Sequence, residues 1–266
     1  MVTRFADSGL QHRWRLPYLW DLLRSLVDRD MKLTYKRSVL GVAWTLINPL
    51  LQLLVFAFVF QIVLPVKIPQ YASYVFAGLL SWNWFQTALY QATGVIISSR
   101  SLIRQPRFPV AILPIVTVTT GLIHFMLALP ILIAFLLIDG IQLTPVILFL
   151  PILQILQFAF TVSCAYFLAA LNVTFRDTQH TLGVILQLFF YLTPIFYDLK
   201  AIPKEYWYIY ALNPMVHIVT SYRQILMWGV PPDWMAIAII AGFTAILWPL
   251  GYWLFKRQSR RFVEEL

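Results

Sequence analysis

The sequence predicts an all-α integral membrane protein with six transmembrane helices. Of its 266 residues, 60% are hydrophobic and 12% are charged, whereas soluble domains average about 45–50% apolar and about 25% charged residues. Long stretches of the chain contain no Asp, Glu, Lys or Arg, and a helix needs about 20 mainly apolar residues to cross a bilayer. A helix also satisfies its own backbone hydrogen bonds inside lipid. These observations exclude a soluble globular enzyme.

Six charge-free stretches are long enough to span the membrane. They predict helices at about 42–63, 73–97, 110–138, 145–170, 180–196 and 234–255. A seventh stretch, 206–222, is aromatic and shorter, and Asn213-Pro214 interrupts it. Because proline breaks a helix and the stretch is short for a span, we expect residues 197–230 to form short helices that lie in the interface or re-enter the membrane.

The Lys and Arg residues predict which side of the membrane each loop faces. With six spans, residues 1–40, the 100–107 and 171–180 loops and residues 256–266 share one side, which holds 16 of the 20 Lys and Arg residues. Cytoplasmic loops carry such an excess, so both termini are expected in the cytoplasm. The net charge of +9 therefore reflects membrane orientation, and no nucleic-acid partner is expected.

Residues 17–37 predict an amphipathic helix on the cytoplasmic membrane surface. Its apolar positions recur at helical spacing and are Leu19, Leu22, Leu23, Leu26 and Val27. Asp28 and Lys32 are an i,i+4 pair in the favourable order, with the acid first. A solvated leader helix is the alternative interpretation.

Two cytoplasmic loops are candidates for contact with a partner. The 98–109 loop is basic, yet it contains three apolar side chains that are unfavourable in water, namely Leu102, Ile103 and Phe108. A docking surface for a cytoplasmic protein explains them, and so does insertion into the lipid headgroups. Arg176 and Asp177 lie in the other loop, and we expect them to cap helix ends or to meet a partner.

The chain lacks the residues of several common chemistries. No G-x-x-x-x-G-K-[ST] phosphate loop is present, so the chain is not expected to hydrolyse ATP. No charged residue lies inside the six expected spans, which argues against an ion-coupled carrier. The four histidines are scattered and Cys164 is the single cysteine, so neither a metal site nor a catalytic residue is expected. His124, near the centre of a span, is expected to form a hydrogen bond between helices.

Aromatic residues are abundant, at 16% of the chain. Many serve as interface anchors, but others fall within the expected spans, and sugar rings stack well on aromatic faces. The candidates for a translocation path are Trp44, Phe56, Phe60, Phe189, Phe190 and Tyr191. For each of them, ordinary packing against lipid is the alternative.

The order of motifs along the whole chain resembles the permease subunit of ABC-2 type polysaccharide exporters, which export O-antigen, teichoic acid or capsule. The resemblance begins in the segment DRDMKLTYKRSVLGVAWTLINPL at 28–50. It continues at Leu102-Ile103-Arg104 with Phe108-Pro109, at Asn172-Val173 with Phe175-Arg176-Asp177, at Thr193-Pro194-Ile195-Phe196-Tyr197 with Ile202-Pro203, and at Leu212-Asn213-Pro214-Met215. Gln105-Pro106 departs from the pattern, since a basic and an aliphatic residue are expected there.

The resemblance implies a cytoplasmic coupling helix and an entrance. The coupling residues, which insert into a separate ATPase subunit, are Arg100, Leu102, Ile103, Arg104, Arg107 and Phe108. The residues at the cytoplasmic entrance are Arg29, Lys32, Lys36, Arg37, Ser38, Leu40 and Gly41. We further expect the basic residues at this entrance to attract a pyrophosphate group.

The resemblance also implies an external gate and an assembly. The gate lies within residues 197–230 and the end of the preceding span, and its residues are Pro194, Tyr197, Asn213 and Pro214. The expected complex, in a bacterial inner membrane, holds two copies of this chain and two copies of an ABC ATPase. ATP and Mg bind to that partner, and this chain needs no cofactor. The expected substrate is a glycan on a polyprenyl pyrophosphate.

Three other functions remain open from the sequence. The nearest is an ABC-2 exporter of a small lipid or drug. A membrane-embedded glycosyl- or acyltransferase needs a His or carboxylate site, and Asp139, Asp198, Glu205 and Asp233 form no evident constellation. A structural scaffold without transport is the third.

Overall fold

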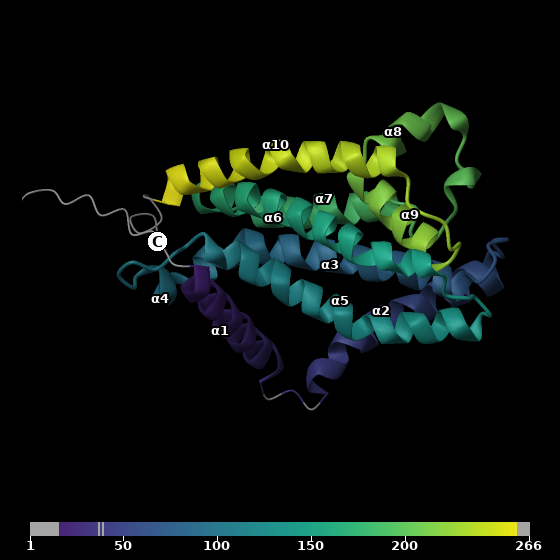
Figure 1. The fold of residues 1–266 in the computed structure, drawn as a ribbon, viewed down its shortest axis with the longest axis horizontal. Coiled ribbons are helices and arrows are strands. Elements are labelled where there is room, and N and C mark those ends of the chain that lie inside the picture. The colour runs from purple at the N-terminus through teal and green to yellow at the C-terminus, as the bar shows by residue number, and fades with distance from the viewer. Residues whose placement is uncertain (1–15, 37, 39, 260–266) are drawn as a thin grey trace, which may run out of the picture.

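Four apolar stretches of the sequence form long helices that lie side by side along the molecule (Figure 1). They are α3 (Tyr71–Ser98), α5 (Ile112–Ile138), α6 (Leu150–Thr174) and α10 (Trp234–Ser259). The computed structural model describes residues 16–36, 38 and 40–259. Within these residues it contains ten α-helices, linked partly by short 3-10 and π-helical segments, and no β-strand. The predicted all-α fold class is therefore confirmed.

Four helical segments in the described chain are long and apolar enough to cross a membrane. They are Trp44–Val63, Ile112–Ile138, Pro145–Thr174 and Trp234–Ser259. The first joins α2 (Trp44–Ala57) to the π-helical η2 (Phe58–Val63), and the third joins the 3-10 helix η3 (Pro145–Phe149) to α6. The two other expected spans correspond to α3, which carries many polar side chains, and to α7 (Thr178–Tyr191), which has 14 residues. The six-span topology remains a prediction.

Helix α3 forms the centre of the bundle and packs against α2, α5, α6, α7 and α9. Its Trp82 side chain is completely buried. Close approach of the neighbouring helices depends on small residues, as is common between membrane helices. A Cβ on Gly121 of α5 would lie 2.7 Å from Cδ1 of Trp84, and one on Gly251 of α10 would lie 2.9 Å from the Ser163 carbonyl oxygen.

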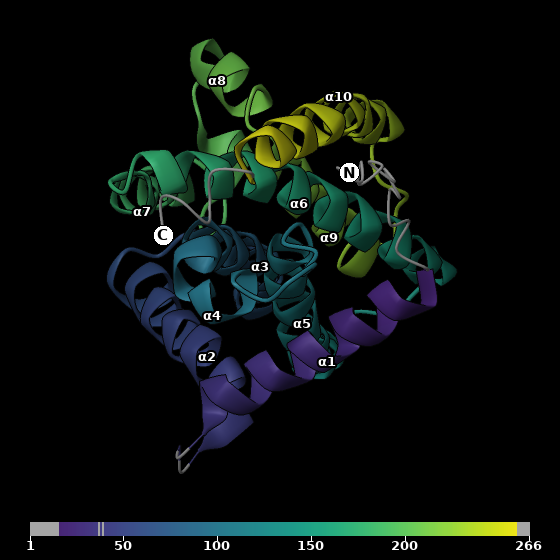
Figure 2. The same ribbon diagram turned by 90° about the vertical axis from the view of Figure 1, so that its left-hand side faces the viewer.

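Helix α1 (Leu16–Tyr35) packs on α5 and crosses one side of the bundle at an angle (Figure 2). Leu26 and Val27 are buried in this contact. Lys32 Nζ lies 2.6 Å from Asp28 Oδ2, as the i,i+4 spacing predicts. The helix is amphipathic as expected, although its last residue reaches the middle of α5, as described below.

The end of α7 differs from the expected span at 180–196. The helix ends at Tyr191, because Pro194 cannot continue it and the Thr193 hydroxyl donates to the Phe189 carbonyl oxygen at 2.7 Å. The chain then forms the 3-10 turns η4 (Leu199–Ala201) and η5 (Lys204–Tyr206), the short helix α8 (Trp207–Ala211) and α9 (Pro214–Leu226). Helix α9 packs against α3, α6 and α10. It is therefore a buried helix of the bundle, and its position relative to the membrane remains a prediction.

Candidate functional site

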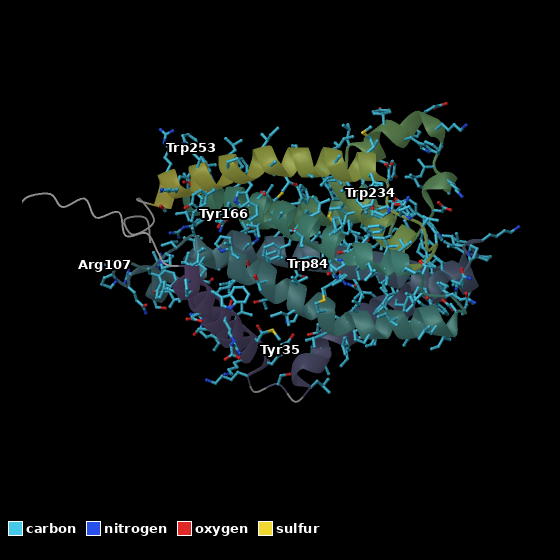
Figure 3. All side chains as sticks on the ribbon, viewed as in Figure 1. Tyr35, Trp84, Arg107, Tyr166, Trp234 and Trp253 are labelled. Atoms are coloured by element: carbon cyan, nitrogen blue, oxygen red, sulfur yellow. The ribbon has the colours of Figure 1, made fainter. Side chains whose placement is uncertain are left out.

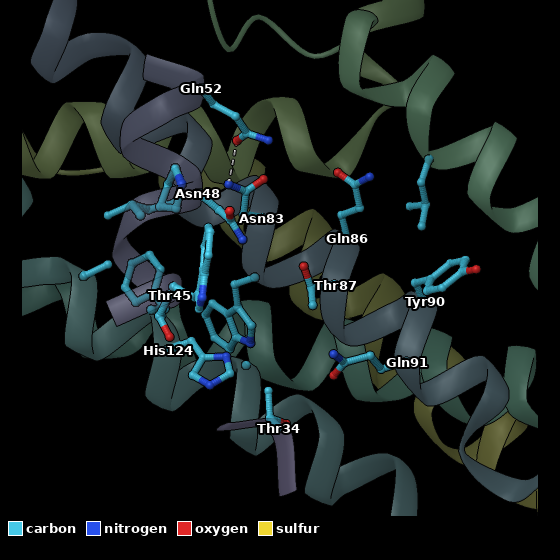
Figure 4. Close-up of a pocket in the computed structure, with 18 of the residues that line it drawn as sticks. Thr34, Thr45, Asn48, Gln52, Asn83, Gln86, Thr87, Tyr90, Gln91 and His124 are labelled. Carbon is cyan, nitrogen blue, oxygen red and sulfur yellow. Dashed lines mark hydrogen bonds between the residues drawn. The ribbon is translucent and has the colours of Figure 1, made fainter. Parts of the chain in front are cut away.

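A groove lined by both polar and apolar residues runs along the bundle between α1, α2, α3, α5 and α7, with a volume of about 710 Å³. Figure 4 shows the polar side chains that line it. We call this cavity the amide groove, because five of its polar residues are Asn or Gln. Its polar lining residues are Thr34, Tyr35, Thr45, Asn48, Gln52, Asn83, Gln86, Thr87, Tyr90, Gln91 and His124.

Helical spacing places these amides on facing surfaces. Asn48 and Gln52 lie one turn apart on α2, while Asn83 and Gln91 lie two turns apart on α3. Asn83 Nδ2 donates to Gln52 Oε1 at 3.0 Å and so links the two helices across the groove. Exposed amides are unfavourable against hydrocarbon, so this face of the bundle requires water, substrate or another protein surface.

The groove was not predicted from the sequence. The predicted path residues are aromatic, and of these only Trp44 lines the amide groove. The sequence does contain a pattern that indicates the groove. Asn and Gln residues recur at helical spacing inside two stretches that contain no charged residue.

A second cavity, of about 580 Å³, continues the groove toward the end of the bundle that carries α4 (Arg100–Ile103). The two cavities share Thr34 and Gln91. Arg29 also lines the second cavity, and its Nη2 lies 2.9 Å from Asp30 Oδ1. We call this cavity the vestibule.

The other described residues among those expected at the entrance do not line the vestibule. Lys32 is paired with Asp28, and Lys36 is exposed. The Ser38 hydroxyl accepts a hydrogen bond from the Gly41 N–H at 3.1 Å, in a turn where Gly41 has φ of +49°, a conformation that favours glycine. Leu40 is exposed, and Arg37 lies outside the described residues.

Tyr35 joins three helices where α1 covers the groove (Figure 3). Its Oη lies 2.6 Å from Thr45 Oγ1 of α2 and 3.0 Å from His124 Nε2 of α5. The same His124 nitrogen lies 3.2 Å from Met31 Sδ. His124 therefore forms hydrogen bonds between helices, as its place in the sequence predicts.

We expect Tyr35→Phe to lower the stability of the folded protein by about 1 kcal/mol, because it removes a hydroxyl that bonds to two partners. Thermal unfolding in detergent measures the effect. Tyr208→Phe is the matched control, since Tyr208 is exposed. Equal unfolding temperatures for the two variants would contradict the role of Tyr35.

An aromatic cluster lies at the other end of α2. Phe56, Phe60, Phe190 and Phe196 form it, with ring centroids 5.1 Å apart for Phe56 and Phe196 and 5.2 Å apart for Phe60 and Phe196. Tyr191 contacts it through the Phe196 ring, with centroids 6.2 Å apart. Since Gln52, Phe56 and Phe60 follow one another at intervals of four residues, one face of this segment changes from polar to aromatic along its length. Of the predicted aromatic path residues, Phe189 alone lies outside both the groove and this cluster.

Side chains from α3 and α9 hold the irregular segment after α7. Arg223 donates to the carbonyl oxygens of Pro194 at 2.6 Å, Ile195 at 2.7 Å and Tyr74 at 3.2 Å. Tyr71 and Tyr74 donate to the next two carbonyl oxygens, of Phe196 and Tyr197. Four consecutive carbonyl groups of the 194–197 segment are thus satisfied, as irregular backbone inside a membrane protein requires.

Arg223 is 2% exposed, and its guanidinium carbon lies 3.5 Å from the centroid of the Tyr74 ring. Burial lowers the pKa of Arg223 to about 10, so the group remains cationic at neutral pH. Gly78 leaves room for it, since a Cβ there would lie 2.7 Å from Arg223 Nη2. Arg223 was not among the site residues predicted from the sequence.

The predicted gate residues lie near this segment. Asn213 caps α9, because its Oδ1 accepts from the Met215 N–H at 3.0 Å, and its Nδ2 donates to Thr193 Oγ1 at 3.0 Å. Pro214 occupies the first turn of α9, where proline is favoured. Tyr197 donates to the Tyr191 carbonyl oxygen at 2.7 Å. The structure therefore brings the four predicted residues together around the end of α7.

Comparison with known proteins assigns the family. The model of the ABC-2 type transporter family matches residues 21–227. The chain belongs to the ABC-2 type transporter family. An O-antigen export system permease protein RfbA of Myxococcus xanthus is 36% identical over 92% of this chain and 95% of its own length. A protein with the same name from Klebsiella pneumoniae is 33% identical over 97% of this chain and 100% of its length. The polysialic acid transport protein KpsM of Escherichia coli is 23% identical over 89% of this chain and 93% of its length.

The segment predicted to couple this ABC-2 transporter to an ATPase forms one end of the bundle, where Arg107 projects (Figure 3). Arg100, Arg104 and Arg107 are exposed. Arg107 has φ of +62°, a left-handed conformation that is uncommon outside glycine. Leu102 and Phe108 are half-buried and pack against the core.

Ile103 differs from its expected placement. It is 6% exposed and belongs to the core of the transporter. Its apolar side chain is explained by packing within the chain, so it is not available as a surface contact. Of the six predicted coupling residues, the exposed ones are Arg100, Arg104 and Arg107.

Arg176 and Asp177 are exposed at the start of α7, and no ion pair between them is present in the described part of the transporter. Asp177 occupies the N-cap position but makes no side-chain capping bond. Asn172, at the end of α6, instead links the start of α7 to α3. Its Nδ2 donates to the Thr93 carbonyl oxygen at 3.0 Å, and its Oδ1 accepts from the Gln179 N–H at 3.2 Å.

Proposed function

We propose that this chain is the transmembrane permease of an ATP-driven exporter that moves polyprenyl-pyrophosphate-linked polysaccharide outward across the bacterial inner membrane. The observation that carries the proposal is the amide groove, which offers amides and hydroxyls inside a chain that is 60% hydrophobic. Sugar hydroxyls need such partners when they leave water. The relatives at 36% and 33% identity are named for O-antigen export, and this points to O-antigen as the substrate. Polysialic acid, a charged polymer, is named for a relative at 23% identity.

Two copies of the chain form the path. The amides of α2 and α3 are exposed or half-buried on one side of the bundle, and an uncovered amide in lipid is costly. A second copy that faces this surface covers it and adds an identical polar wall. In this arrangement α3 and α7 supply the second and fifth of six spans.

The vestibule is the cytoplasmic entrance, where Arg29 receives the pyrophosphate. The start of α1, the end of α10 and α4 lie at this end of the bundle (Figure 1), and we place both termini in the cytoplasm. The aromatic cluster and the 194–197 segment lie at the outer end, with α8 and α9 as the gate helices. The polar lining favours a hydroxyl-rich polymer over the alternative cargo, a small lipid or apolar drug.

ATP hydrolysis occurs in a separate ABC ATPase, present in two copies, which also binds the Mg. Arg100, Arg104 and Arg107 are exposed and free to meet acidic residues of that subunit. This chain has no catalytic residue and holds no metal in the proposed mechanism. It converts movement of the 100–108 segment into opening of the path.

A crosslinking experiment tests the assembly. Arg104→Cys is introduced into a Cys164→Ser chain, and a short bifunctional reagent is added to native membranes. We expect capture of an ABC ATPase subunit. Ile103→Cys is the matched control and is expected to capture nothing, because Ile103 is buried.

Export is measured in the same cells. Deleting the chain is expected to remove polysaccharide from the surface and to leave lipid-linked polymer on the cytoplasmic side, while the Cys164→Ser chain restores export. Unchanged surface polysaccharide after deletion would overturn the proposed function. Equal capture of the ATPase from both cysteine positions would overturn the docking surface.

A further inference from the structure

The amide groove contains no Asp, Glu, Lys or Arg among the described residues that line it. His124 is its one group that can become cationic near neutral pH, and its Nε2 is already engaged by Tyr35 at 3.0 Å. The vestibule adds Arg29 and Asp30, which are paired with each other at 2.9 Å. The described walls of the path therefore present almost no net charge.

The polar groups of the groove are donors and acceptors at once. Asn48, Gln52, Asn83 and Gln91 each carry an NH₂ and a carbonyl oxygen, and Thr87 adds a hydroxyl. A sugar hydroxyl has the same dual capacity, so an uncharged sugar can form hydrogen bonds with every such group. These side chains are also exposed or half-buried, so they are accessible to a polymer that moves past them.

A charged polymer meets the opposite situation. Taking an ion out of water costs several kcal/mol unless a counter-ion or a dense set of donors replaces the water. The groove supplies no counter-ion among its described residues, and an identical second copy adds none. For a polymer with one carboxylate in each repeat, every repeat that enters the groove has to be taken out of water at this free-energy cost. The pyrophosphate of the lipid carrier is a single group and crosses once.

We propose that the glycan carried by this permease is uncharged, and that the amide groove selects against polymers with a carboxylate or phosphate in each repeat. This inference rests on the proposed function and names its substrate class. The residues that select against charged polymers are then the amides of α2 and α3.

The test compares two polymers in cells that lack their own permease and contain this chain with its ATPase partner. Both polymers share the lipid carrier, the backbone and the terminal sugar. One is a neutral hexose polymer, and the other carries a hexuronic acid branch on each repeat. We expect export of the charged polymer to be at least tenfold slower. Asn83→Lys places a cation in the groove and is expected to raise export of the charged polymer at least fivefold.

Gln142→Lys is the matched control, since it adds the same charge on an exposed loop outside the groove. It is expected to leave both rates unchanged. Equal export of the two polymers by the unmodified chain would overturn the charge selectivity while leaving the proposed export function in place. If neither polymer is exported, the proposed function itself is contradicted and this inference with it.

Discussion

Replacing Arg223 with methionine is expected to abolish polysaccharide export and to reduce the yield of folded protein. Methionine has a similar length but donates no hydrogen bond, so the carbonyl oxygens of Tyr74, Pro194 and Ile195 lose a donor. Each buried group left unpaired costs about 1–3 kcal/mol, which is large against a typical total stability of about 5–15 kcal/mol. Surface polysaccharide and the monodisperse fraction in detergent measure the two effects.

A second substitution separates positioning of the gate from folding. Arg223→Lys keeps a positive charge but replaces the planar guanidinium by one compact ammonium group, which cannot reach all three carbonyl oxygens. We expect this variant to fold and to export at about one tenth of the normal rate or less, because the 194–197 segment is no longer fixed. Lys204→Met, at an exposed position of the neighbouring η5, is expected to export normally. Normal export from Arg223→Met would show that the segment needs no support from α9.

Much of the architecture could be predicted from the sequence because it depends on local composition. The charge-free stretches predicted the long apolar helices, and the spacing of Leu26, Val27 and Asp28 predicted the amphipathic α1. The motifs at 28–50 and 193–197 predicted the family, which the match over residues 21–227 confirms. Each of these features can be recognised within one continuous segment.

The rest depends on contacts between distant segments. Arg223 acquires its role only because α9 folds back beside Tyr74, which lies 149 residues earlier in the chain. Ile103 was selected for an external contact because an apolar residue in a basic loop is conspicuous, yet the loop turns it into the core. The polar lining of the groove arises where α2 faces α3, whereas the path predicted from the sequence consists of aromatic residues.

Replacing both Gln52 and Asn83 with leucine is expected to reduce export at least tenfold without loss of the folded protein. The two amides face each other across the groove at 3.0 Å, and leucine at both positions removes the hydrogen-bonding partners of passing sugars. Unpaired hydroxyl groups in an apolar environment raise the free energy of the polymer in the path. Folding should persist because leucine favours helix and neither side chain is buried.

Two matched variants isolate hydrogen bonding as the cause. Gln61→Leu makes the same change at an exposed position of the adjoining η2, outside the groove, and is expected to export normally. Exchange of the two amides, Gln52→Asn with Asn83→Gln, keeps donors and acceptors on both helices and is expected to retain most of the activity. Export is measured as surface polysaccharide per inserted permease. If the leucine pair exports as well as the exchanged amides, sugars do not depend on the amides of this groove, and the path must lie along another face of the bundle.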